Sequence, residues 1–164
     1  MYPSAIRAQR SVKMGGNPDT RFGHMMLSLC RSRELYDWYL EHGIKVGITP
    51  RVIDADDIMK DPAAVRKLCL QTGLDPEAVQ YEWEERKVED PLISRFLSTI
   101  NASKGILPGL TAEGLDIEAE KKKWVDEFGK EAGEALARKV DESMADYEYL
   151  RERRTTGGAK VGAK

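Results

Sequence analysis

The stretch from Pro50 to Gly73 constrains the fold of this chain more than any other. Residues 51–54 are rich in β-branched side chains, which predicts a short buried strand, and an acidic turn over residues 55–60 follows. Asp61 and Pro62 then begin a helix, because aspartate caps a helix N-terminus and proline fits the first turn. Gly73 ends it, since glycine adopts the left-handed conformation without steric cost. This order predicts half of a parallel α/β unit, whose partner strands must come from elsewhere.

Three aspartates, Asp54, Asp56 and Asp57, stand at the end of the predicted strand. Carboxylates at this place can bind a metal ion or hold an active-site base. Aspartate is also a common cap and turn residue, and these side chains have Arg51 and Lys60 as possible ion-pair partners. Both interpretations are open at this point. The structural one is favoured, so no metal site is predicted.

The rest of the chain has helical patterns bounded by cap residues, prolines and glycines. The expected helices cover residues 5–14, 20–42 with a break near Ser32, 76–83, 92–103, 117–128 and 131–153. Asp19 is expected to cap the helix over residues 20–42, with Phe22, Met25 and Met26 on its apolar face, and Asp116 to cap the helix over residues 117–128. The fold class predicted from these patterns is α/β, predominantly helical, with one or two short strands. Residues 1–154 are expected to form one domain, and residues 155–164 a flexible tail rich in glycine and lysine.

The N-terminal helix carries a candidate anion site. Ser4 is a natural N-cap for a helix that starts at Ala5, and Arg7, Arg10 and Lys13 recur every three residues along one face. A capping hydroxyl, free N–H groups and a basic stripe together favour an anion. The same residues are typical of a solvated surface helix with an ordinary cap, and from the residues alone this interpretation is favoured.

Composition and motifs exclude several classes of protein. A net charge of −2 argues against a general nucleic-acid binder, and no apolar run approaches the roughly 20 residues that cross a bilayer. The first residues lack the apolar core of a signal peptide, so a cytoplasmic location is expected, with Cys30 and Cys69 as reduced core thiols. The sequence contains no Gly-rich phosphate loop, GxGxxG, GxSxG or HExxH motif.

The segment PRVIDADDIMKDPAAVRKLCLQTGLDPEAV resembles a region in the second half of the sulfotransferase fold. In that region a strand leads to an acidic turn, then to a helix that starts with Asp-Pro and closes on Gly-Leu. Here Asp56-Asp57-Ile58, Asp61-Pro62 and Gly73-Leu74 stand in the same order. The segments SRELYDWYLEHGI, STINASKGILPG and KKWVDEFG resemble a fungal-type, P-loop-containing sulfotransferase family over most of residues 20–154. Residues 46–49 look like a short insertion relative to that family.

The resemblance implies transfer of a sulfuryl group from phosphoadenosine phosphosulfate (PAPS) to a hydroxyl or amine acceptor. In such enzymes an arginine and, about eight residues later, a serine just inside a helix hold the ribose phosphate. Ser4 matches that serine, with Arg7 beside it, and the family's arginine would lie upstream of Met1. A later Lys-Gly element also contacts this phosphate, and Lys104 and Gly105 match it, although the family's following G-x-W-K pattern is not reproduced. An ordinary helix end is the favoured explanation of Lys104-Gly105.

The resemblance therefore predicts the C-terminal portion of a P-loop sulfotransferase fold without its phosphate loop, so that PAPS or its product PAP would be held at one end only. Such a chain would be inactive alone. Two other interpretations are open: a helical protein-interaction module, and a non-functional truncated product. An unpaired sheet edge beside the predicted strand would favour a homodimer.

Overall fold

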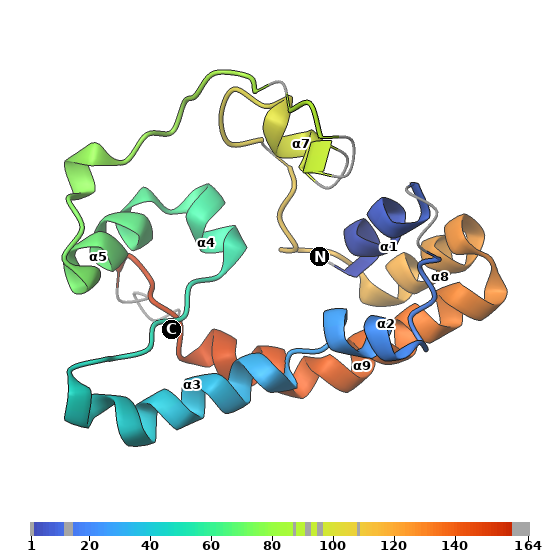
Figure 1. Ribbon diagram of the computed structural model, residues 1–164, viewed down its shortest axis with the longest axis horizontal. Helices are drawn as coiled ribbons and strands as arrows, with labels where there is room; N and C mark the ends of the chain where they lie inside the picture. Colours follow the sequence, from blue (N-terminus) through green and yellow to red (C-terminus); the bar gives the residue numbers. More distant parts are fainter. Residues whose placement is uncertain are drawn as a thin grey trace, which may run out of the picture. The chain divides into compact units, whose positions relative to one another are not determined.

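The computed structural model describes residues 2–11, 15–86, 88–90, 93–94, 97–107 and 109–158. The fold over these residues is predominantly helical (Figure 1). Its elements are α1 (Tyr2–Ser11), α2 (Arg21–Met26), α3 (Cys30–His42), η1 (Gly43–Val46), α4 (Ala55–Lys60), α5 (Pro62–Thr72), η2 (Pro76–Ala78), α7 (Ser98–Asn101), α8 (Ile117–Phe128) and α9 (Lys130–Glu152). None of the described helices is both long and apolar enough to cross a membrane.

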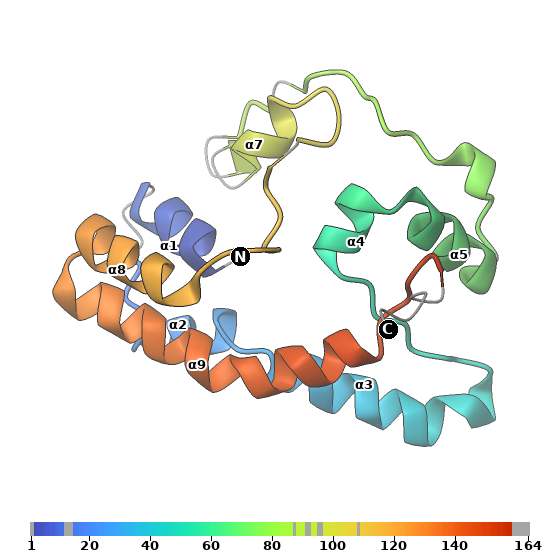
Figure 2. The same cartoon turned by 180° about the vertical axis from the view of Figure 1, so that it is seen from behind.

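The chain divides into two compact units. Unit 1 contains the described residues of 1–30, 84–104 and 114–145, and unit 2 those of 31–83, 105–113 and 146–164. Within unit 1, α1, α8 and the first part of α9 lie side by side in both views (Figure 2). Unit 1 holds the buried apolar cluster of the protein and unit 2 holds the Pro50–Gly73 stretch, so each is described by itself.

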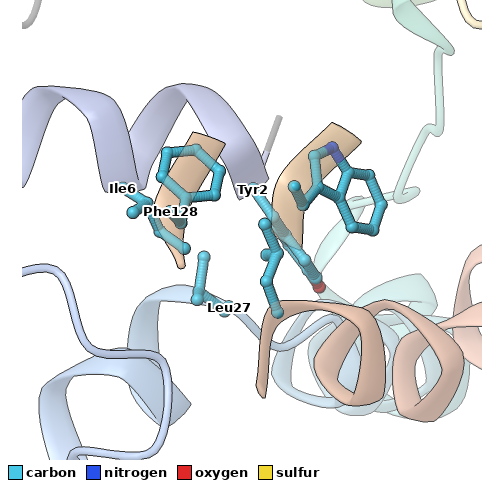
Figure 3. Close-up of a cluster of buried hydrophobic side chains, with 6 residues drawn as sticks. Tyr2, Ile6, Leu27 and Phe128 are labelled. Atoms are coloured by element: carbon cyan, nitrogen blue, oxygen red, sulfur yellow. The ribbon is translucent and has the colours of Figure 1, made fainter. Parts of the chain in front are cut away.

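The core of unit 1 is a small cluster of large side chains. Figure 3 shows Tyr2 and Ile6 of α1 facing Phe128 of α8 and Leu27, which follows α2. Trp124 and Leu136 complete the buried set. The hydroxyl of Tyr2, which is 7% exposed, forms a hydrogen bond of 2.8 Å to Oγ of Ser143 on α9. This cluster fixes α1 against α8 and thereby places the polar residues of α1.

The predicted helix at Pro62–Thr72 is confirmed in its bounds and in both of its caps. Oδ1 of Asp61 accepts the N–H of Ala63 at 3.0 Å, and Pro62 is the first helical residue. Gly73 has φ +75° and its N–H donates to the carbonyl oxygen of Cys69, which ends the helix as predicted. The predicted cap at Asp116 is confirmed for α8 in the same way.

The predicted strand at residues 51–54 is wrong, because the described residues contain only isolated bridges and no sheet. Val52 makes one parallel bridge to Arg154, and its carbonyl oxygen accepts the N–H of Thr155 at 2.7 Å. A single extended segment cannot form a strand without a neighbouring strand of its own length. The predicted homodimer through an unpaired sheet edge is therefore wrong for this part of the chain. The predicted acidic turn is helix α4, capped by Asp54.

Three further predictions need correction near the N-terminus. The helix begins at Tyr2, so Ser4 lies inside the first turn and is not its N-cap. The expected helix over residues 20–42 is two helices separated at residues 27–29, because Leu27 turns into the core. The cap is Thr20, whose hydroxyl accepts the N–H of Gly23, and the side chain of Asp19 instead pairs with Arg138 at 2.8 Å.

Some side chains predicted to be buried are exposed. Phe22 and Met26 are each 43% exposed and Met25 is 67% exposed, since the six-residue α2 contacts the core through Gly23 and Leu27. Cys69 is buried, but Cys30 is exposed. Lys13, the predicted helix end at Met14, and Pro91, Leu92 and Phe96 of the helix expected over residues 92–103 lie outside the described residues.

The C-terminal segment of unit 2 returns to the beginning of α5. The N–H of Gly157 donates to Oδ2 of Asp61 at 3.0 Å, and Nζ of Lys67 donates to the carbonyl oxygen of Thr156 at 3.1 Å. Thr155 is buried. The rest of the expected tail, residues 159–164, lies outside the described residues.

Candidate functional site

Helix α1 presents its arginines to the end of α8. Tyr2, Ile6 and Gln9 follow the i, i+4, i+7 spacing of one helix face, and all three are buried. Arg7 and Arg10 lie beside this face, with their guanidinium carbons 5.8 and 5.1 Å from the centroid of the Phe128 ring. Two cations are therefore held at the C-terminus of α8, where the helix dipole favours positive charge.

Arg7 is bound by a carboxylate. Its Nε and Nη2 donate to Oε1 and Oε2 of Glu127 at 2.5 and 2.7 Å, in a two-bonded geometry that suits a guanidinium and a carboxylate. The hydrogen bond from Arg7 lowers the pKa of Glu127, and the same bond raises the pKa of Arg7. Both side chains remain well exposed to solvent. Any anion that binds Arg7 must therefore compete with Glu127.

Arg10 has a different partner. Its Nη2 donates to the carbonyl oxygen of Phe128 at 3.0 Å, and no carboxylate pairs with it within the described part of the chain. Arg10 also lines a cavity of about 400 Å³ together with Lys130 and the Gly15–Asn17 segment. A second cavity of about 330 Å³ lies on the same segment and is lined by Gln9 and Phe22. Arg10 thus keeps donor capacity beside a space large enough for a small molecule.

The other predicted site residues lie on different segments of the chain. Ser4 is exposed in the first turn of α1, one helical turn before Arg7. Lys104 follows α7 in unit 1 and lies 3.8 Å from Oε2 of Glu85. Gly105 belongs to unit 2, where it bridges to Glu82. Within the described residues, the side-chain bonds of Arg7 and Lys104 go to different glutamates, so no contact brings α1 and Lys104 together.

Gly105 occupies a position that restricts side-chain size. A Cβ atom there would lie 3.0 Å from the carbonyl oxygen of Tyr81, which is closer than ordinary van der Waals contact. The antiparallel bridge therefore disfavours a side chain at this position. The same fact agrees with either interpretation of the Lys104-Gly105 pair, as an ordinary helix end or as a phosphate contact.

The three aspartates after residue 53 have structural roles. Asp54 caps α4 and its Oδ2 accepts the hydroxyl of Tyr147 at 2.9 Å. Asp56 accepts the N–H groups of Ala112 and Glu113, at 2.9 to 3.1 Å. Asp57 pairs with Arg154 at 2.6 Å. Asp54 is a cap, as expected, whereas the ion-pair partner of Asp57 differs from the expected Arg51 and Lys60. Among the described residues no group of three acidic, His or Cys side chains is placed to hold a metal ion.

Two features of the site escaped sequence reasoning. Glu127 was not expected to bind Arg7, because the two residues are separated by 120 positions and only the packed core brings them together. The cavities at the Gly15–Asn17 segment were also missed, although two consecutive glycines before a helix start are a signal of close backbone approach. Both misses concern contacts between distant parts of the sequence.

Comparison with known proteins gives two similar relatives. The chain is 31% identical over 167 residues to the protein named sulfotransferase ppzF of Metarhizium rileyi (strain RCEF 4871), and 31% identical to that of Metarhizium majus (strain ARSEF 297). Each match covers 93% of this chain and 49% of the relative, so the chain spans about half the length of the curated relatives it matches. No family model and no solved structure matches the chain. The chain is therefore homologous to part of a fungal sulfotransferase, and the resemblance to that family is confirmed.

Proposed function

We propose that the chain is part of a PAPS-dependent sulfotransferase, in which residues 1–154 form the portion that holds the ribose-phosphate end of the nucleotide. The observation that carries this proposal is the homology to the two ppzF sulfotransferases over 93% of the chain. The reaction is the transfer of a sulfuryl group from PAPS to a hydroxyl or amine acceptor. On this proposal, the matched portion would correspond to the C-terminal half of the family's fold.

The ribose phosphate would be held by Ser4 and Arg7 of α1. The two residues are three positions apart and so lie on neighbouring turns of one face, and both are exposed to a ligand. Arg7 supplies two N–H donors in the fork that suits a phosphate, once Glu127 releases it. Lys104, which follows α7 in the same unit, would supply a lysine from a separate segment.

The sequence printed here contains no Gly-rich phosphate loop. In sulfuryl transfer, rate enhancement depends on stabilising charge at the transferring group and on a base for the acceptor. The 164 residues supply neither group in an identifiable form. They should therefore bind the nucleotide product without turning over, and a transfer assay with labelled PAPS and a phenol acceptor should show no product above the rate without protein.

Calorimetric titration with adenosine 3′,5′-bisphosphate tests the binding proposal. Arg7→Ala should weaken binding about tenfold or more, because it removes a bidentate charged contact with a phosphate, and Ser4→Ala should weaken it less. The matched control is Arg21→Ala, an exposed arginine on α2 with no ion pair in the described residues. Equal affinity of the Arg7 variant and the wild type for the nucleotide would overturn the assignment of α1. Sulfuryl transfer by this chain alone would overturn the proposal that it holds only one end of the nucleotide.

A second candidate function is a helical interaction module. The tip formed by α3 and η1 in unit 2 leaves Trp38 53%, Ile44 72% and Val46 71% exposed, a local concentration of apolar surface that favours contact with another protein. Light scattering coupled to size-exclusion chromatography separates the two functions. A stable dimer that dissociates on Trp38→Ser, with no affinity for the nucleotide, supports the module. A monomer that binds the nucleotide supports the sulfotransferase proposal.

A further inference from the structure

The Gly15–Asn17 segment lines both of the cavities of unit 1 described above. We infer that this pair of cavities binds a small molecule carrying a phosphate or sulfate group. The oxyanion lies at Arg10, Lys130 and the N-terminus of α9, and the remainder of the ligand lies against Gln9 and Phe22. This site uses none of the residues assigned to the ribose phosphate.

The oxyanion end is built from a long helix and two cations. Helix α9 runs from Lys130 to Glu152, and the residue before it, Gly129, has no side chain to accept the first N–H groups. These groups and the helix dipole favour an anion. Lys130 has no ion-pair partner among the described residues, and Arg10 bonds only to the carbonyl oxygen of Phe128 there. Glu131 lines the same cavity and is the one carboxylate on its described wall.

An independent observation comes from Gln9 in the adjoining cavity. This residue is only 4% exposed, and its amide forms no hydrogen bond within the part of the chain that the structure describes. Its amide atoms keep a small contact with solvent, because in the described part of the chain Nδ2 of Asn101 is the fully buried side-chain N or O atom without a partner. Gln9 lines the 330 Å³ cavity, so a ligand there can supply the missing donor and acceptor.

The remaining wall of this cavity suits a flat group. Phe22 exposes 43% of its surface and lines the cavity, although it was expected in the core. Asn17 accepts the N–H of Asp19 through Oδ1 at 2.8 Å, which leaves its amide N–H groups as donors. Gly16 has φ +81°, and a Cβ atom there would lie 2.9 Å from Cγ of Arg10. The glycine therefore allows Arg10 to lie between the loop and the end of α8.

The oxyanion half is tested by an NMR titration of the full chain with inorganic phosphate at constant ionic strength. The amide signals of Gly16, Gly129 and Lys130 should shift together along one binding curve. Lys130→Gln should weaken binding roughly two- to fivefold, the loss expected for one solvent-exposed charge. The matched control, Lys122→Gln on the exposed side of α8, should leave the curve unchanged. Equal curves for the two variants, or no common shift, would overturn the site.

The Gln9 half is tested with two aryl esters. In the wild type, 4-carbamoylphenyl phosphate should bind more tightly than phenyl phosphate, because its amide can pair with that of Gln9. Gln9→Leu keeps the volume and should abolish this preference. If this variant does not fold, the side-chain NH₂ signal of Gln9 in the wild type gives the same answer, since it should shift with the carbamoyl ester and not with phenyl phosphate. A shift with neither ester, or an equal shift with both, would overturn the assignment of Gln9.

The outcomes separate this site from the proposed nucleotide site. Variants of Lys130 and Gln9 leave Ser4 and Arg7 in place, so failure of the phosphate titration would leave the sulfotransferase proposal intact. Conversely, the Arg7 variant can lose its affinity for adenosine bisphosphate while the inorganic-phosphate titration followed at the amide signal of Lys130 stays unchanged.

Discussion

Arg7 and Glu127 form a two-bonded ion pair across unit 1, with Nε to Oε1 at 2.5 Å and Nη2 to Oε2 at 2.7 Å. The pair joins the helix proposed to hold a phosphate to the end of α8. A phosphate that takes the same two N–H groups of Arg7 must displace this carboxylate. The ion pair therefore sets the affinity of the proposed nucleotide site, and it can be altered without touching Arg7.

Glu127→Gln should raise the affinity for adenosine 3′,5′-bisphosphate roughly two- to fivefold, because an exposed charged competitor for Arg7 is removed. The measurement is calorimetric titration at low salt. Glu134→Gln, an exposed glutamate on α9 outside the ion pair, serves as the control and should leave affinity unchanged. A decrease in affinity in the Glu127 variant would mean that Arg7 does not meet the nucleotide.

The same pair predicts a pH dependence of stability. The hydrogen bond from Arg7 lowers the folded-state pKa of Glu127 below its ordinary value of 4.5. Its contribution to the free energy of unfolding is therefore fully present above pH 4.5 and is lost as the pH falls through the folded-state pKa. Because both side chains are well exposed, solvent screening limits this contribution to about 1 kcal/mol or less.

Urea denaturation of the wild type and Glu127→Gln at a series of pH values measures this contribution. The difference in unfolding free energy should be constant from pH 7 to about pH 5 and then shrink in acid. A difference that stays constant through the acid range would show that the ion pair is not formed in solution.

Tyr147 and Asp54 provide a second test, in unit 2. The Tyr147 hydroxyl donates to Oδ2 of Asp54 at 2.9 Å, and burial, followed by this bond, raises the pKa of Tyr147 above 10.0. Tyr147→Phe should lower the free energy of unfolding by about 1 kcal/mol. The difference should persist below pH 10 and disappear as the pH rises through the folded-state pKa. Tyr36→Phe, which removes a hydroxyl without a recorded partner in the described residues, should cost less at every pH.

The ion pair of Asp57 and Arg154 should contribute more to the free energy of unfolding than the exposed ion pairs do. Their side chains are 19% and 16% exposed, and the pair fixes the C-terminal segment to α4. Asp57→Asn leaves the guanidinium half-buried without its carboxylate, so we expect a loss of about 1–3 kcal/mol of unfolding free energy by urea denaturation. Asp126→Asn on the exposed side of α8 is the control. Equal losses in the two variants would contradict the role of this pair.

Local signals predicted the helices whose ends are determined by neighbouring residues. Asp61, Pro62 and Gly73 set the bounds of α5 within the helix itself, and Asp116 does so for α8. The strand at residues 51–54 failed because a strand depends on a partner that local sequence does not specify. The break expected near Ser32 in the helix over residues 20–42 lies instead at residues 27–29, because Leu27 is buried there.

For the candidate site, the sequence predicted the basic residues of α1 but not the groups to which they bond. The basic stripe on α1 follows from its three-residue spacing, and the structure places Arg7 and Arg10 side by side over Phe128. Their partners could not be predicted, because Glu127 and the carbonyl of Phe128 reach them only through the packing of α1 on α8. Ser4 was expected as a cap, but the helix starts at Tyr2, two residues before Ser4.

The central claim is that α1 binds the ribose phosphate of a sulfotransferase nucleotide. The most direct measurement compares the affinities of adenosine 3′,5′-bisphosphate and adenosine 5′-monophosphate, which differ only in that phosphate, for the wild type and for Arg7→Ala. The account predicts that the wild type prefers the bisphosphate by about tenfold or more, and that the variant has lost this preference. Equal affinity of the wild type for both nucleotides, or a preference that survives the substitution, would contradict it.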